Sequence, residues 1–160
     1  MSDEQSAHLP DVASGVPQRP EPVQSAEGQA VRVLLVDDEQ AICHALTLLL
    51  GWHGLAVVTA GSAAEARAAL GAQAFDVLLI DLRLRDGRGD AFFRHAVERD
   101  PSLKSRTLFI TGDISTEAER LIAATNCPYL RKPFDITLMV QAITAMAGVP
   151  YPATARPAEA

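Results

Sequence analysis

Hydrophobic residues in this chain form two kinds of pattern that alternate along it. Short, mostly apolar runs predict strands at 31–36, 55–59, 75–80, 107–110 and 128–130. The unbroken run at 77–80, rich in branched side chains, is typical of a strand buried on both faces. Between the predicted strands, apolar residues recur every three or four positions, which indicates amphipathic helices. We predict helices from Glu39 to about residue 51, from Ser62 to about 70, over 90–99, after Ser115 and after Pro133.

Five strand–helix units in succession predict an α/β fold with a parallel sheet covered on both faces. Right-handed crossovers then place the carboxyl ends of all the strands at one edge. The folded domain is predicted to span 31–148. The flanks, 1–30 and 149–160, contain many prolines among small and polar residues, so we expect them to be disordered tails.

The stretch from Phe75 to Gly89 is central to the pattern. Its apolar run, 77–80, stops at Asp81, and Asp86, Gly87 and Gly89 then predict a loop. Asp81 should therefore lie at the carboxyl end of a central strand, which is where ligands bind in open parallel sheets. A carboxylate at this position must be solvated, paired or bound to a metal.

Other polar residues follow the ends of the neighbouring predicted strands. They are Asp37 and Asp38 after the first, Thr111 after the fourth and Lys132 after the fifth. Clustered carboxylates with no nitrogen or sulfur ligands suit Mg²⁺. An ammonium group and a hydroxyl can contact phosphate oxygens, and an aspartate can act as the nucleophile that forms an aspartyl phosphate. The predicted site therefore suits phosphoryl transfer.

Composition narrows the class of protein. The net charge of −6 argues against general nucleic-acid binding, and there is neither a membrane-spanning apolar run nor a signal peptide. Cys43 and Cys127 fit no disulfide framework or metal motif, so we expect a reducing, cytoplasmic location. The four histidines have no partners at metal-ligand spacing.

Four motifs resemble the signatures of response-regulator receiver domains, in the order and at the spacing of that family. They are VDDE at 36–39, IDLRL at 80–84, ITGD at 110–113 and LRKPF at 130–134. The resemblance covers 31 to about 147. It implies a doubly wound (βα)5 flavodoxin-like fold with strand order 2-1-3-4-5.

The resemblance also implies the roles of individual residues. Asp81 would accept a phosphoryl group from a histidine kinase or histidine phosphotransfer protein. Mg²⁺ would be bound by Asp38 and Asp81 directly, by Asp37 through water and by the backbone carbonyl of Arg83. In addition, Lys132 would pair with the phosphate, Thr111 would turn toward it, Tyr129 would be the aromatic switch residue, and Lys132–Pro133 would be a candidate cis peptide.

The loop after Asp81 departs from the family pattern. Arg85 replaces a common proline, and Arg83 and Arg88 make the loop basic. Arg83 could reach the phosphoryl site and influence phosphate lifetime, or it could be an ordinary solvated arginine.

We therefore predict a single-domain response regulator and not a multiple-turnover enzyme, although it would promote its own Mg²⁺-dependent phosphorylation and dephosphorylation. The residues after Gly148 are too few for a DNA-binding module, so the output is expected to be contact with a downstream protein. The alternative is a receiver-fold binding module that works without phosphorylation. A dehalogenase-type phosphatase is disfavoured because its nucleophile precedes its acidic pair, and a dinucleotide site lacks its Gly-rich turn.

Overall fold

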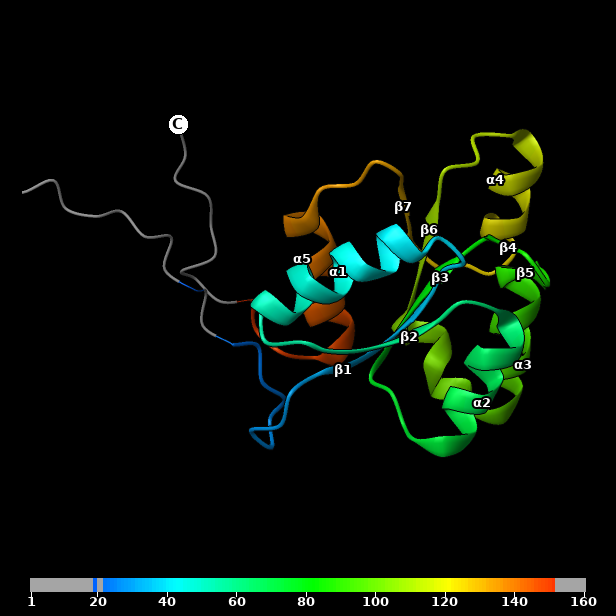
Figure 1. Cartoon of the computed structure of the whole chain (residues 1–160). Helices are drawn as coiled ribbons and strands as arrows, with labels where there is room; N and C mark the ends of the chain where they lie inside the picture. The colour runs from blue at the N-terminus through cyan, green and yellow to red at the C-terminus, as the bar shows by residue number, and fades with distance from the viewer. Residues whose placement is uncertain (1–18, 20–21, 152–160) are drawn as a thin grey trace, which may run out of the picture.

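The computed structural model describes Arg19 and residues 22–151. Its main sheet has five parallel strands in the order β2-β1-β3-β6-β7 (Figure 1). The strands are β1 (Arg32–Val36), β2 (Ala56–Ala60), β3 (Val77–Asp81), β6 (Thr107–Thr111) and β7 (Tyr129–Arg131). Because β6 and β7 are the fourth and fifth strands of this sheet in chain order, the predicted order 2-1-3-4-5 is confirmed.

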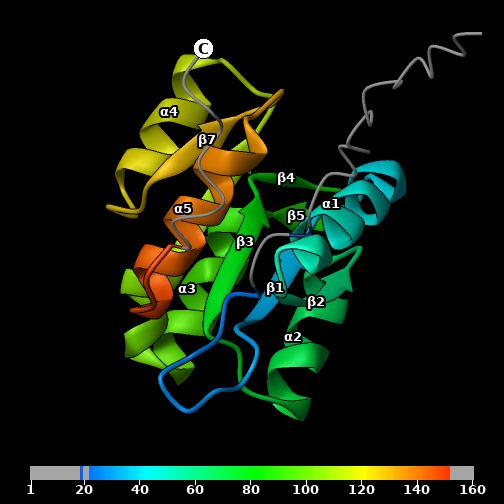
Figure 2. The ribbon, with the colours of Figure 1, turned by 90° about the vertical axis from the view of Figure 1, so that its left-hand side faces the viewer.

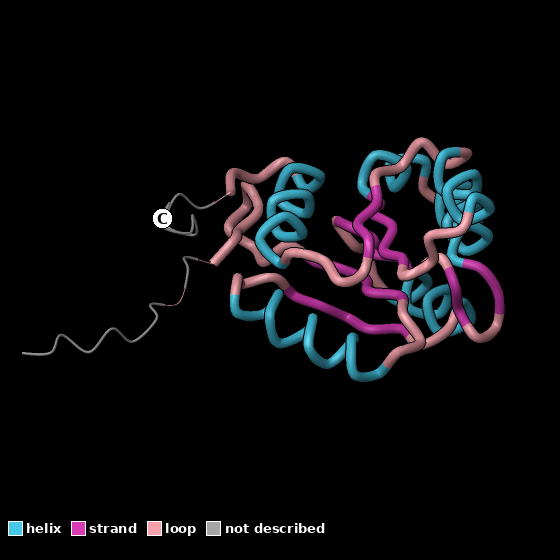
Figure 3. Tube along the Cα trace, turned by 90° about the horizontal axis from the view of Figure 1, so that it is seen from above, coloured by secondary structure: helices cyan, strands magenta, loops and turns pink. Residues whose placement is uncertain are grey.

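Helices cover both faces of the sheet, as Figure 3 shows from above. One face packs against α1 (Gln40–Trp52) and α5 (Ile136–Ala147). The other packs against α2 (Ala63–Ala72), α3 (Gly89–Arg99) and α4 (Thr116–Ala123). Within the described residues, every helix is too short or too polar to span a bilayer.

Successive residues of the central strands point into opposite hydrophobic layers. Leu34, Leu78 and Phe109 belong to the cluster under α2, α3 and α4, whereas Val33 and Leu79 belong to the cluster under α1 and α5. This two-residue period is the normal strand alternation. Here both sides are apolar because both faces are covered, which explains the unbroken hydrophobic runs in the sequence.

The predicted helix caps form. The Ser62 hydroxyl accepts a hydrogen bond from the Glu65 N–H (3.1 Å) at the start of α2. The Ser115 hydroxyl does the same for Ala118 (3.2 Å) at α4. Each cap satisfies one of the amide groups that lack a partner in the first turn of a helix.

A short β-hairpin and a 3₁₀ helix lie outside the predicted set. The loop after Asp81 contains an antiparallel hairpin of β4 (Arg83–Leu84) and β5 (Gly87–Arg88), and a 3₁₀ helix, η1 (Pro101–Arg106), precedes β6. The hairpin is held by tertiary contacts: Leu84 is buried in the core, and the Asp86 carboxylate accepts hydrogen bonds from the amides of Ala63 (2.9 Å) and Ala64 (3.2 Å).

Residues 22–30 were predicted to be part of a disordered tail, but in the structure they pack against the domain (Figure 2). Val23 is 2% exposed and lies in the core cluster under α1 and α5. Its N–H donates to the His53 carbonyl (2.9 Å), and Gln24 and Ala30 form an antiparallel bridge. At the other end, Val149 is buried on the same cluster. The remainder of the two predicted tails, at 1–18, 20–21 and 152–160, lies outside the described residues.

Candidate functional site

The carboxyl edge of the sheet gathers the polar residues that the sequence scatters. Asp37 follows β1, Asp81 and Thr111 are the last residues of β3 and β6, and Lys132 follows β7. Because the strands are parallel and in register, Asp37 and Lys132 meet although they are 95 positions apart. The resulting hollow has a volume of about 480 Å³ and is lined by Asp38, Glu39, Asp81, Arg83, Thr111, Gly112, Asp113 and Lys132.

Lys132 is the centre of the hydrogen-bond network in this hollow. Its ammonium group donates to Asp81 Oδ2 at 2.8 Å, to Asp37 Oδ2 at 2.9 Å and to Glu39 Oε1 at 3.2 Å. The side chains of Asp37 and Asp81 are 0% and 8% exposed, and that of Lys132 is 13% exposed. One partly dehydrated cation therefore bridges two buried carboxylates and offsets one of their two negative charges. Sequence reasoning missed the Glu39 contact, although its position beside Asp38 was the available signal.

The environment changes the pKa values of the central pair. Burial raises the pKa of Asp81, although the hydrogen bonds from Lys132 and from the Arg83 N–H oppose that rise. Burial alone would lower the pKa of Lys132, but its hydrogen bonds to Asp81 and Asp37 outweigh it and raise the pKa instead. The ammonium is therefore held in its charged form, ready to pair with an anion.

Three carboxylates fit a hard divalent cation. Asp37, Asp38 and Asp81 each offer an oxygen, and these oxygens lie within 4.8 Å of one another. Asp37 already accepts hydrogen bonds from the Glu39 N–H (2.9 Å) and Lys132, whereas no group in the described part of the chain donates to the Asp38 carboxylate. An all-oxygen set with such a free carboxylate suits Mg²⁺, which keeps several waters.

Comparison with known proteins identifies the family. The sequence model of the response regulator receiver domain matches residues 33–144. The chain belongs to this family. Members of the family are phosphoacceptor regulators and not classical enzymes, and they bind Mg²⁺ at an acidic pocket.

Relatives of this receiver domain include bacterial transcriptional regulators. The chain is 32% identical over 123 residues to the probable transcriptional regulatory protein TcrX of Mycobacterium tuberculosis, covering 76% of this chain and 51% of TcrX. It is 33% identical to the transcriptional regulatory protein TrcR of the same organism, covering 74% of this chain and 46% of TrcR. The chain thus spans about half the length of these curated relatives.

Solved structures show the same fold. A CheY-like receiver domain protein from Methanospirillum hungatei superposes with a TM-score of 0.69 at 26% identity, covering 75% of this chain and 95% of that one. A response regulator from Burkholderia pseudomallei, solved with a phosphorylated aspartic acid and a calcium ion, gives a TM-score of 0.65 at 25% identity. That match covers 74% of this chain and 69% of that one.

The two predicted switch residues of the receiver domain lie on neighbouring strands. Thr111 is 2% exposed, and its hydroxyl accepts a hydrogen bond from the Asp113 N–H (2.9 Å). Tyr129, on the edge strand β7, is 41% exposed and pairs in register with Phe109 of β6. Arg131 lies over its ring at 6.0 Å. Lys132–Pro133, the candidate cis peptide, is cis.

Arg83 makes two different contacts at the site. Its backbone N–H donates to Asp81 Oδ1 (3.1 Å), and its guanidinium forms an ion pair with Asp113. The sequence alone allows this side chain to be either a phosphoryl contact or a solvated arginine. The Arg83 side chain is largely exposed, in line with the second alternative, and it also pairs with Asp113, a contact between two loops that neither motif reveals.

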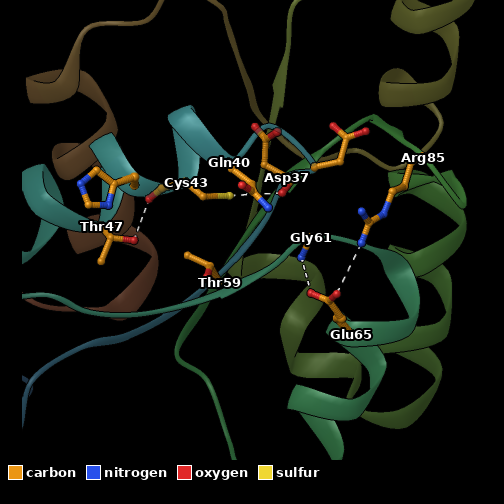
Figure 4. A pocket seen from close by; sticks show the side chains of 10 residues that line it. Asp37, Gln40, Cys43, Thr47, Thr59, Gly61, Glu65 and Arg85 are labelled. Carbon is orange, nitrogen blue, oxygen red and sulfur yellow. Dashed lines mark hydrogen bonds and ion pairs between the residues drawn. The ribbon is translucent and has the colours of Figure 1, made fainter.

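Backbone geometry restricts the end of β3. Gly89 lies so close that a Cβ atom there would be 2.0 Å from the Asp81 carbonyl oxygen, so only glycine fits. The hairpin also contacts α2, because Arg85 faces Glu65 and forms an ion pair with it (Figure 4). The Glu65 carboxylate in turn accepts a hydrogen bond from the Gly61 N–H (2.7 Å). The strand end that carries Asp81 is thus restricted by the backbone of Gly89, and the hairpin that follows it is held against α2.

Proposed function

We propose that this receiver domain accepts a phosphoryl group on Asp81 from a histidine kinase or histidine phosphotransfer protein, and signals by changing a protein-binding surface. The observation that carries the proposal is the Lys132 ammonium, which holds Asp81 and Asp37 together at 2.8 and 2.9 Å beside the free carboxylate of Asp38. The phosphorylated aspartic acid of the Burkholderia pseudomallei relative supports the same chemistry.

The proposed transfer uses an aspartate as nucleophile. One Asp81 carboxylate oxygen attacks phosphorus, and the new P–O bond forms as the P–N bond to the donor imidazole breaks, with the electron pair leaving on nitrogen. Lys132 then moves with the new charge and donates to a phosphoryl oxygen. In dephosphorylation, a water attacks phosphorus and the P–O bond to Asp81 breaks, which releases phosphate and restores the carboxylate.

We assign the metal ligands to Asp38 and Asp81 directly, to Asp37 through water and to the Arg83 carbonyl. A bound Mg²⁺ would neutralise charge on the transferring phosphoryl group. The hydrogen bonds support the difference between Asp38 and Asp37, because both oxygens of Asp37 already accept hydrogen bonds while the Asp38 carboxylate accepts none in the described structure. Both oxygens of Asp81 accept as well, so Asp81 would exchange one of these bonds for the metal.

The proposed output is a change at the β6–β7 edge. If Thr111 turns toward the phosphoryl group, space opens behind it that the half-exposed Tyr129 can fill. The acidic net charge gives no support for nucleic-acid binding, so we propose a protein as the downstream partner. The free thiols of Cys43 and Cys127 agree with a reducing cytoplasm.

Phosphoryl uptake tests the proposal. Incubating the full chain with Mg²⁺ and a small acyl-phosphate donor should add one phosphoryl mass, and Asp81→Asn should abolish that gain. Asp86→Asn, which changes an acidic residue of the same loop, should retain it. Uptake by Asp81→Asn would show that another residue is the acceptor. No uptake by the wild type, from the small donor or from a phosphohistidine donor, would favour a binding module that works without phosphorylation.

A further inference from the structure

An ion pair crosses the mouth of the phosphoacceptor hollow. Arg83 comes from the loop after Asp81, and Asp113 comes from the loop after Thr111; both the Nε and an Nη of Arg83 face one carboxylate oxygen of Asp113. The Arg83 side chain is 68% exposed, whereas that of Asp113 is 14% exposed. The pair therefore links the acceptor strand to the strand that carries the proposed switch residue.

Asp113 also holds the Thr111 hydroxyl. The Asp113 N–H donates to Thr111 Oγ1 at 2.9 Å, and the same hydroxyl lies 3.4 Å from the Asp113 carbonyl oxygen. Among the described interactions, Thr111 makes none with Asp81. The three residues are thus linked in series: the Arg83 guanidinium pairs with the Asp113 carboxylate, and the Asp113 N–H bonds the Thr111 hydroxyl.

A phosphoryl group on Asp81 would compete for the guanidinium. Arg83 is tied to the acceptor already, because its N–H donates to Asp81 Oδ1 (3.1 Å). A phosphoryl group carries about −1.5 to −2 charges against one on Asp113, and its oxygens match the fork of an arginine. Once Asp81 is phosphorylated, the Arg83 guanidinium therefore has a more highly charged partner than Asp113, on the residue that the Arg83 N–H already contacts.

Asp113 can release Arg83 without being left bare. Its Oδ1 keeps the hydrogen bond from the Ser115 N–H (2.8 Å) at the start of α4. That bond is also the first cause of its lowered pKa. The next residue, Ile114, is 74% exposed, so the loop has little packing that would resist movement.

We propose that Arg83 is a positioning residue that acts as a latch on Thr111. In the unphosphorylated protein its guanidinium holds Asp113, and through Asp113 it keeps the Thr111 hydroxyl away from the acceptor. Phosphorylation of Asp81 draws the guanidinium off Asp113, and Thr111 is released toward the phosphoryl oxygens. The inference rests on the proposed phosphorylation of Asp81, and it adds the element that couples this event to the switch.

The side-chain NMR signal of the Arg83 Nε–H group tests the latch directly, with Arg83→Lys used to assign it. Without phosphate, Asp113→Asn should shift this signal, because the pair is lost. After phosphorylation the signals of the wild type and Asp113→Asn should coincide, because both guanidinium groups then face the phosphoryl group. A merely structural ion pair would keep the two proteins different in both states.

The Thr111 methyl signal tests the second half of the series. Without phosphate, Arg83→Ala and Asp113→Asn should each move this signal part of the way toward its phosphorylated position. Because an exposed ion pair contributes little energy, its removal should change the ratio of the two Thr111 states by roughly two- to five-fold. The double variant should match the single ones, since both remove the same interaction. Arg85→Ala, which breaks the neighbouring exposed pair with Glu65, is the matched control and should leave the Thr111 signal unmoved.

The outcomes separate the latch from the proposed function. A wild type that takes up no phosphoryl group, read by mass, overturns the proposed function and the release step with it. Normal uptake with an unshifted Arg83 signal overturns the latch alone. An unmoved Thr111 signal in both unphosphorylated variants, with their folds intact by amide NMR, overturns it as well.

Discussion

The two edges of the sheet are built in opposite ways. At the amino edge, where the strands begin, residues 22–30 close the domain, and Val23 and Val31 are buried at 2% and 1% exposure. At the carboxyl edge, the buried groups include Asp37, Asp81 and Thr111. The amino edge is closed by apolar packing, whereas at the carboxyl edge the buried carboxylates share hydrogen bonds from a single lysine.

The contrast separates stability from function. Apolar burial at the amino edge stabilises the fold with no requirement for a particular partner. At the carboxyl edge, neighbouring carboxylates repel one another, and the Lys132 ammonium and the backbone amides of Glu39 and Arg83 offset part of that repulsion. The first edge should therefore tolerate ligands and phosphorylation without change, while the second should respond to both.

The largest expected effect is at Gly89. A Cβ there would lie 2.0 Å from the Asp81 carbonyl oxygen and 2.7 Å from Ile80 Cγ2, so Gly89→Ala must move the acceptor strand. We expect a loss of about 3 kcal/mol in the free energy of unfolding, measured in urea, together with impaired phosphoryl uptake.

Gly71 provides the matched control. It lies in α2, and no atom lies within 4 Å of the position that a Cβ would occupy, so Gly71→Ala should be neutral or stabilise by up to about 1 kcal/mol. Equal stability of Gly89→Ala and wild type would show that the backbone approach at Asp81 is not a constraint.

The carboxyl edge was the more predictable of the two from sequence. Asp37, Asp81 and Thr111 each come at the end of a strongly apolar strand, and Lys132 follows the short strand β7, so parallel topology alone is enough to gather them. The Glu39–Lys132 and Arg83–Asp113 contacts could not be predicted in the same way, because they depend on side-chain rotamers in loops.

The amino edge was less predictable because its signal is weak. Val23 is a single apolar residue in a proline-rich polar stretch, and its burial depends on a hydrophobic cluster formed by distant parts of the chain. The β4–β5 hairpin escaped prediction for a similar reason, since Asp86 is stabilised by the start of α2, 22 and 23 positions away. Local pattern cannot reveal an element that tertiary contacts hold in place.

An intermediate effect is expected at Val23. Val23→Ala removes two buried methyl groups and leaves a cavity, which should cost about 2 kcal/mol in the free energy of unfolding. Phosphoryl uptake and Mg²⁺ affinity should stay at wild-type values, because the substitution lies at the opposite edge from the site. Glu27→Ala, exposed in the same segment, should remain within about 0.5 kcal/mol of wild type. A changed Mg²⁺ affinity in Val23→Ala would break the proposed independence of the two edges.

The smallest expected effect, and one that changes sign with metal, is at Asp38. Without Mg²⁺, Asp38→Asn removes one like charge from a cluster whose oxygens lie within 4.8 Å, so it should raise the free energy of unfolding by about 0.5 kcal/mol. At a Mg²⁺ concentration about ten times its Kd, the wild type should gain about 1.4 kcal/mol from binding, whereas the variant should gain little. The more stable protein without metal should therefore become the less stable one with it, in parallel urea titrations with EDTA or Mg²⁺. The same gain in both proteins would mean that Asp38 is not a metal ligand.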